Sequence, residues 1–157
     1  MRLTTYTDYA LRTLMYLAVN RDRLVTIQDI ANLHSISKNH LTKVVHHLGQ
    51  IGLVTTIRGR NGGLRLGSEP ADINIGEVVR QTETDFHMAE CFQRENNRCV
   101  YASDCVLEDA LGAATAAYLR VLDGVTLEKL VVKTSAGLDG GNSSQPVTFR
   151  ARTPIAG

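Results

Sequence analysis

The hydrophobic positions near the start of the chain recur every three or four residues, which is the spacing of a helix with one buried face. This pattern predicts a first helix that begins near Thr4 or Thr7 and ends before the polar stretch NRDR. Its apolar stripe comprises Tyr6, Ala10, Leu14, Leu17 and Ala18.

Two shorter helices are expected to follow. Thr26 is a candidate N-cap with Asp29 three positions later, and Ser37 is a candidate N-cap for the next helix, which should stop at Gly52. We expect their inward faces to contain Ile27, Ile30, Ala31 and Leu33 in one helix and Leu41, Val44, Val45 and Leu48 in the other. Two short helices joined by a tight turn predict a helix-turn-helix.

Beyond Gly52 the hydrophobic period changes to two. LVTTIR reads as a strand, GRNGG as a glycine-rich reversal and LRLG as the returning strand. A helix-turn-helix followed by a β-hairpin is a winged helix. The predicted fold class is therefore mainly α with a small β-hairpin wing, extended by a long helix further along the chain.

The rest of the chain predicts a short helix in NIGEVVRQTE, a polar loop with all three cysteines, and an alanine-rich helix from about Ser103 to Leu122. TLEKLVVK predicts a last short helix, and the Gly- and Ser-rich tail from Ser135 lacks periodicity. We thus expect a winged helix-turn-helix DNA-binding domain at 1–82, a cysteine loop at 83–106, a dimerisation helix with a short C-terminal helix at 103–133, and a flexible tail at 134–157.

Composition favours a folded protein, because 43% of the 157 residues are hydrophobic and 21% are charged. No apolar run is long enough to span a membrane, and the amphipathic N-terminus does not read as a signal peptide. We therefore expect a cytoplasmic protein with no membrane association. In a reducing compartment, three cysteines point to metal binding or redox chemistry more than to disulfides.

The two parts of the chain differ in charge. Residues 1–82 contain ten Lys or Arg against six Asp or Glu, whereas residues 83–157 contain seven against ten. The basic part is where an anionic partner is expected.

Double-stranded operator DNA is the expected partner of this basic part. The start of the second helix of a helix-turn-helix reaches base edges in the major groove, and arginines of a wing can contact phosphates or enter the minor groove. The candidate residues on the helix are Lys38, Asn39, His40, Thr42 and Lys43, and those on the wing are Arg58, Arg60 and Arg65. Since two half-sites are usually read by a symmetric dimer, we expect a homodimer that pairs through the alanine-rich helix.

Cys91, Cys99 and Cys105 are the candidate metal ligands. Their spacing is neither that of a zinc ribbon nor the C-x-x-C of a dithiol oxidoreductase. Three thiolates on one loop suit zinc, copper(I) or an iron-sulfur cluster, while redox-active or structural cysteines are the alternatives. A fourth ligand is missing locally, and His87 is the nearest histidine.

An enzyme is the rival class of function. Arg98 beside Cys99 could activate a nucleophilic thiol, but no Ser/His/Asp order, phosphate loop or pair of catalytic carboxylates is present in the sequence. The sequence therefore predicts a protein that is not an enzyme.

Four segments resemble the cluster-binding winged-helix transcriptional repressors, which include nitric-oxide-sensing, iron-sensing and iron-sulfur-sensing branches. These segments are MRLTTYTDYALR, SISKNHLTKVVHHLGQIGLVTTIRGRNGGLRLG, INIGEVVRQTETDF and ECFQRENNRCVYASDC. The resemblance covers roughly residues 1–132.

The resemblance implies a homodimeric repressor whose iron-sulfur cluster is held by Cys91, Cys99 and Cys105. It favours a [4Fe-4S] over a [2Fe-2S] cluster, nitric oxide as the signal, and Asp8 of the other subunit as the fourth ligand. The iron-sulfur-sensing branch instead uses a histidine three residues after its last cysteine, where this chain has Glu108. SKNHLTKVVHHLGQIG is closer to the nitric-oxide branch, and the iron-sensing branch is the alternative.

Overall fold

The computed structural model describes residues 2–93, 95, 97–100 and 105–138. Its elements, in chain order, are α1 (Thr5–Val19), α2 (Ile27–His34), α3 (Lys38–Gln50), β1 (Val54–Ile57), β2 (Gly63–Leu66), α4 (Ile75–Thr82), the 3-10 turn η1 (Glu90–Phe92), α5 (Val106–Asp123) and α6 (Leu127–Leu138). This mainly helical order with one hairpin confirms the predicted fold class. None of the described helices is long and apolar enough to cross a bilayer.

The helix starts follow the predicted caps. The Thr26 hydroxyl accepts a hydrogen bond from the Asp29 N–H while the Asp29 carboxylate accepts from the Thr26 N–H, which is a complete capping box. Thr4 caps α1 by accepting from the Thr7 N–H. Ser37 stands at the N-cap of α3, but its side chain makes no capping hydrogen bond.

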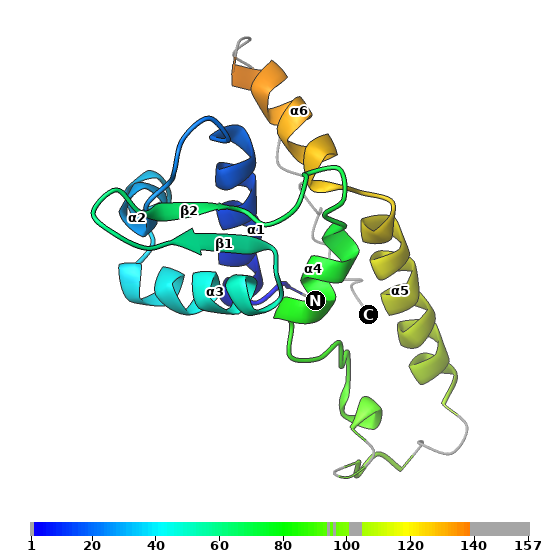
Figure 1. Cartoon of the computed structure of the whole chain (residues 1–157). Helices are drawn as coiled ribbons and strands as arrows, with labels where there is room; N and C mark the ends of the chain where they lie inside the picture. Colours follow the sequence, from blue (N-terminus) through cyan, green and yellow to red (C-terminus); the bar gives the residue numbers. More distant parts are fainter. Residues whose placement is uncertain (1, 94, 96, 101–104, 139–157) are drawn as a thin grey trace, which may run out of the picture.

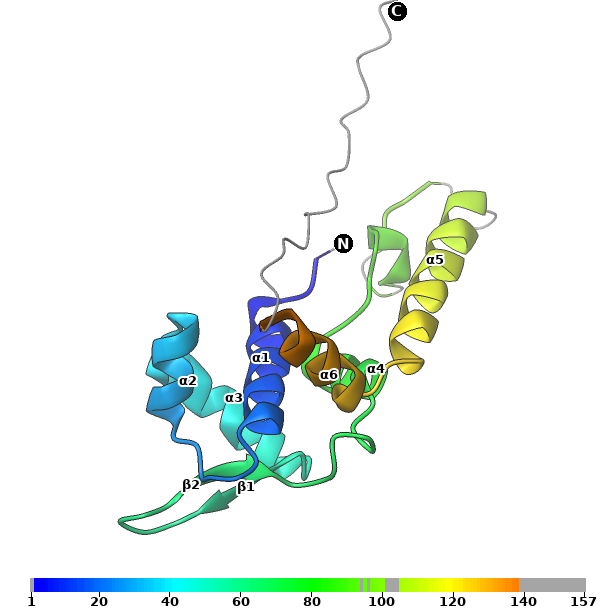
Figure 2. The ribbon, with the colours of Figure 1, turned by 90° about the horizontal axis from the view of Figure 1, so that it is seen from above.

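The core lies around α1. Ala10 and Leu14 of α1 are fully buried, as are Leu41 and Leu48 of α3, and the ribbon shows α1 between the helix-turn-helix and the α4–α6 region (Figures 1 and 2). One prediction was wrong, because Leu33 is 61% exposed rather than inward. α2 is only eight residues long and buries only Ile30 and Ala31. The apolar face predicted from its sequence is therefore wider than the face of α2 that α3 covers.

The wing is an antiparallel pair in register from Val54↔Leu66 to Ile57↔Gly63. Gly59 reverses the chain with φ +116°, a conformation that residues with a Cβ rarely adopt. The buried Leu64 exchanges backbone hydrogen bonds of 2.7 and 3.0 Å with Val25. The wing is therefore attached to the chain that enters α2 and projects beyond the helices (Figure 2).

α4 joins the winged helix to α5. The Arg80 guanidinium forms two hydrogen bonds, of 2.5 and 2.8 Å, with the Asp123 carboxylate at the end of α5. Gly76 lies so close to Asp123 that an added Cβ would overlap its carboxylate. The following turn is fixed by the hydrogen bonds Ile75 N–H to Val125 O and Leu127 N–H to Ile73 O.

The long helix differs in its limits from the sequence interpretation. α5 begins at Val106, and Ser103, the predicted start, lies outside the described residues. α6 continues to Leu138, past the predicted boundary at 133, and the remaining tail at 139–157 lies outside the described residues. No residue of α5 is buried within the single chain, and Val106, Leu107 and Val121 are 80%, 64% and 70% exposed.

Candidate nucleic-acid interface and cysteine loop

The first turns of α3 present the five predicted DNA-contacting residues to solvent. Lys38, Asn39, His40, Thr42 and Lys43 are all exposed, because the buried residues of the helix, Leu41, Val44, Val45 and Leu48, lie on its other face. The Thr42 hydroxyl donates to the Lys38 carbonyl at 2.9 Å, so it is already partnered within the helix. The structure thus brings these side chains together on one accessible face.

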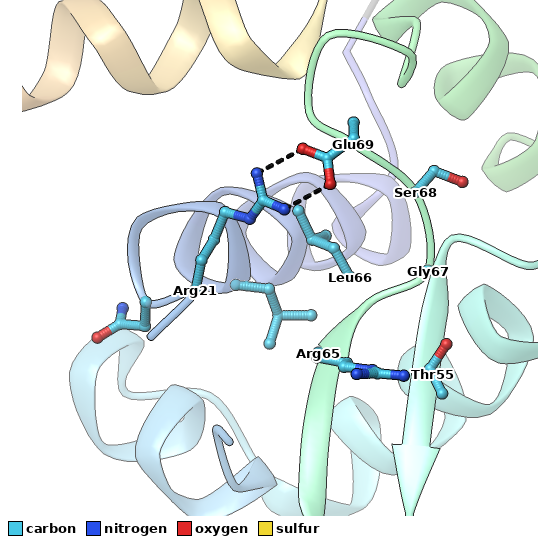
Figure 3. A pocket seen from close by; sticks show the side chains of 9 residues that line it. Arg21, Thr55, Arg65, Leu66, Gly67, Ser68 and Glu69 are labelled. Carbon is cyan, nitrogen blue, oxygen red and sulfur yellow. Dashed lines mark hydrogen bonds and ion pairs between the residues drawn. The ribbon is translucent and has the colours of Figure 1, made fainter. Parts of the chain in front are cut away.

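The predicted wing arginines occupy two different positions. Arg58 and Arg60 are exposed in the turn of the hairpin, whereas Arg65 lies in β2 opposite Thr55. Arg65 and Thr55 line a pocket of about 440 Å³ between the wing and the end of α1 (Figure 3). Arg65 is therefore set back from the tip of the wing. Its position favours a DNA contact less than the positions of Arg58 and Arg60 do.

An ion pair across this pocket fixes the base of the wing. The two terminal nitrogens of Arg21 each donate to one oxygen of Glu69 at 2.6 Å (Figure 3). These hydrogen bonds lower the pKa of Glu69. Because both side chains are about half exposed or more, the pair is screened by solvent and serves mainly to orient the segment that leaves β2.

Two tyrosines of α1 contact the recognition helix directly. The Tyr6 hydroxyl lies 3.0 Å from Nδ1 of His47, and burial raises the pKa of Tyr6. The Tyr9 ring stacks on His40 with 6.4 Å between ring centres. The start of α1 therefore contacts α3 at two residues, one of which is the predicted DNA contact His40, and the sequence interpretation had missed this connection.

In the sequence, Asp8 lies between these two tyrosines, in the first turn of α1. Its carboxylate oxygens are 3.0 Å from Nε of Arg12, and both side chains are more than 40% exposed. Burial and the nearby Arg12 lower the pKa of His34, while Asp8 acts in the opposite direction. Asp8 is thus accessible from outside the subunit but is already paired with an arginine.

The three cysteines are free thiols. Cys91 lies in η1 and Cys105 at the N-cap position of α5, both half-buried, while Cys99 is exposed. The neighbouring Phe92 ring reaches α5, where a Cβ on Gly112 would lie 3.9 Å from it. The two ends of the cysteine-bearing segment therefore meet along the first half of α5.

Cys91 has titratable neighbours from other parts of the loop and from α5. Burial raises the pKa of Cys91, and the Glu108 carboxylate and the thiols of Cys105 and Cys99 raise it further. Cys99, Cys105 and Glu108 therefore lie near enough to Cys91 to affect its thiol. Among the residues that the structure describes, however, no three His, Cys, Asp or Glu side chains are arranged as a ligand set for a metal ion.

The other candidate ligands differ in their surroundings. Glu108 acts on the pKa of Cys91 and so belongs to the same group. Nδ1 of His87 lies 3.7 Å from the Asp85 carboxylate, earlier in the loop. The structure associates Glu108 most directly with the thiols.

A match to a protein-family model shows to which family this chain belongs. The family model Rrf2, described as iron-dependent transcriptional regulator, matches residues 3–133. The chain belongs to the Rrf2 family. It is therefore a transcriptional regulator and not an enzyme, as the sequence predicted.

Curated Rrf2-like relatives cover most of the chain. The HTH-type transcriptional regulators NsrR of Bacillus subtilis and Bacillus licheniformis are 57% and 55% identical over 132 and 133 residues, which are 83% and 84% of this chain and 90% and 93% of theirs. Protein aau3 of Rhizobium meliloti is 44% identical over 131 residues, 83% of this chain and 85% of its own. The predicted resemblance to this group is confirmed.

Solved structures support the Rrf2 fold. The global cysteine regulator CymR of B. subtilis aligns with a TM-score of 0.70 and 27% identity, over 85% of this chain and 98% of its own. IscR of T. potens aligns with a TM-score of 0.69 and 22% identity, over 92% and 94%. At that identity the second likeness shows the fold alone.

The exposed wing leads to a first testable expectation. Replacing Arg58 with Ala should weaken binding to a duplex that the unchanged protein selects from a random DNA pool. It should also reduce the slope of log affinity against log salt by about one, because one phosphate contact is lost. Lys129→Ala is the control, since Lys129 is an exposed cation on α6, outside both the wing and α5. Equal affinities and slopes for both variants would remove Arg58 from the interface.

The surroundings of Cys91 give a second expectation, for the reduced, metal-free protein. Glu108→Gln removes a negative charge that raises the pKa of Cys91, so more thiolate should form at pH 8 and iodoacetamide should alkylate Cys91 at least about twofold faster. Mass spectrometry measures the rate, with Asp109→Asn as the control one residue further on. Unchanged alkylation in the Glu108 variant would show that this carboxylate does not face Cys91.

Proposed function

We propose that this Rrf2-family chain is a cytoplasmic, homodimeric transcriptional repressor that holds an iron-sulfur cluster and releases operator DNA when nitric oxide is present. The observation that carries the proposal is the presence of three free thiols, two of them near enough to affect Cys91, on a loop connected to the winged helix through α4 and α5. The identity of 50–57% to several curated NsrR regulators supports it.

The donor set suits such a cofactor. Cys91, Cys99 and Cys105 offer three soft thiolate ligands, and none is used in a disulfide. Three thiolates leave one iron position for a further ligand in a [4Fe-4S] cluster, which we favour over a [2Fe-2S] cluster. When bound, the cluster supplies iron that reacts directly with nitric oxide.

Asp8 of the partner subunit is our candidate for the remaining ligand. Within one chain Asp8 is half-exposed and pairs with Arg12, so its carboxylate is available to a second copy. A hard carboxylate binds iron less strongly than a thiolate does. Such a ligand is easily displaced, and Arg12 is placed to receive the released carboxylate.

The exposed apolar residues of α5 supply the expected dimer surface. Val106, Leu107 and Val121 are largely exposed in the single chain, and α5 has no buried residue of its own. A helix that exposes several apolar side chains in this way is expected to bury them against another subunit. Pairing through α5 would bring the cysteine loop of each chain to the interface.

Loss of the Asp8 ligand would act on DNA binding through α1. Tyr6 and Tyr9, on either side of Asp8, contact His47 and His40 of α3. A shift of the start of α1 therefore changes the position of the recognition helix. A hundredfold change in operator affinity requires a difference of about 2.7 kcal/mol between the two arrangements.

Sensing of iron is the second candidate function, because the matching family is described as iron-dependent. The same thiols would hold the cofactor in both cases, and the signal alone would differ. A response to iron removal without a response to nitric oxide would favour this candidate.

An anaerobic titration tests the proposal. The purified protein is expected to absorb visible light and to bind its selected duplex, and added nitric oxide should bleach the absorbance in step with DNA release. The Cys99→Ala variant should show neither the absorbance nor the response, because it removes an exposed ligand without disturbing the core. A colourless protein, even after anaerobic reconstitution with iron and sulfide, that still bound DNA would contradict the cofactor part.

A further inference from the structure

Glu83 connects the beginning of the cysteine loop to the beginning of α1. It is the C-cap residue of α4, and its Oε1 accepts hydrogen bonds from the Thr4 N–H at 2.8 Å and from the Thr4 hydroxyl at 3.1 Å. Thr4 is in turn the N-cap of α1 and accepts from the Thr7 N–H at 3.2 Å. One side chain thus joins two helix ends that are 79 positions apart in sequence.

The contact is electrostatically favourable for α1. The first N–H groups of a helix lack partners within the helix, and a carboxylate near this end interacts favourably with the helix dipole. Asp8, the acidic residue in the first turn, is paired with Arg12. Glu83 therefore supplies a carboxylate to the start of α1 from outside the helix.

The surroundings of Glu83 include the helix that we assign to dimerisation. Tyr118 of α5 lines the same pocket of about 350 Å³ as Thr4 and Glu83. Burial raises the pKa of Tyr118, and the Glu83 carboxylate raises it further. The start of α1, the start of the cysteine loop and α5 therefore meet at one place.

We propose that Glu83 is a positioning residue, which couples the state of its own cysteine loop to the start of α1 and hence to the recognition helix. This rests on the proposed function, since it requires a loop whose state changes. A change in the loop that moves Glu83 removes two hydrogen bonds from Thr4. Tyr6 and Tyr9 follow directly in α1, and they contact α3.

The proposed Asp8 ligand would connect a cysteine loop to α1 of the other subunit. The Thr4–Glu83 contact adds a second connection, between the cysteine loop and α1 of the same subunit. Glu83 acts on the N-cap of α1, and Asp8 lies one helical turn further along the same helix. The two effects therefore converge on the first turns of α1. A signal at either cysteine loop would reach the recognition helix of each subunit.

The first measurement is made on the reduced, metal-free protein. Glu83→Ala should speed hydrogen exchange of the Thr4 amide, because its only described acceptor is lost, and Glu83→Gln should do so less, because its amide oxygen can still accept. Asp85→Asn is the matched control, since its carboxylate accepts from the His87 N–H inside the loop. Unchanged exchange at Thr4 in the Glu83→Ala protein would show that the contact is absent.

The second measurement is the ratio of duplex affinities before and after nitric oxide, using a duplex that the unchanged protein selects from a random pool. Glu83→Ala should reduce this ratio at least about fivefold, a size typical of coupling between sites. The affinity after nitric oxide should stay the same, because the contact of Glu83 with Thr4 is already lost in that form. Thr4→Ser keeps both donors and should keep the ratio, whereas Thr4→Val should reduce it.

The outcomes separate this proposal from the proposed function. If the unchanged protein responds to nitric oxide and Glu83→Ala keeps the full ratio, Glu83 is not a positioning residue. Equal weakening of both forms would make it a structural residue only and would also overturn the proposal. If the unchanged protein shows no response, the proposed function fails, and the coupling assigned to Glu83 fails with it.

Discussion

The close approach of α4 to α5 is the constraint on which the arrangement of this protein depends. Gly76 leaves room for Asp123 against the α4 backbone, and Arg80 holds the same carboxylate with two hydrogen bonds. Because α4 also contacts α1, the base of the long helix is fixed to the DNA-binding half. The cysteine loop therefore runs between two helices whose relative position is set.

This constraint determines how a change in the loop can be transmitted. One end of the loop is anchored to α1 by Glu83 and the other continues directly into α5. α1 packs its buried face on α3 and places Tyr6 and Tyr9 against the recognition helix. The exposed salt bridges contribute little to stability, and their main effect is to orient these elements.

The sequence predicted the elements far better than the contacts between them. Helical spacing, the Thr26 capping box and the glycine-rich turn identify the winged helix, since each depends on neighbouring residues. Leu33 was placed wrongly because the width of a buried face is set by its neighbour in space. The pairs Thr4–Glu83 and Arg80–Asp123 join distant positions and leave no local pattern. Cys91, Cys99 and Cys105 stay predicted ligands, and Glu108 was singled out in the sequence by its position three residues after Cys105, but its effect on Cys91 depends on the fold.

The central claim is that the cysteine loop of one subunit and α1 of the other form one site, and mixed dimers test it most directly. One subunit would contain Asp8→Ala, and the other would have all three cysteines replaced by alanine. Our account expects half of the wild-type visible absorbance per dimer, with wild-type stability and response to nitric oxide, because the intact cysteines meet the intact Asp8 of the other chain. Behaviour identical to that of the Asp8→Ala homodimer would contradict it.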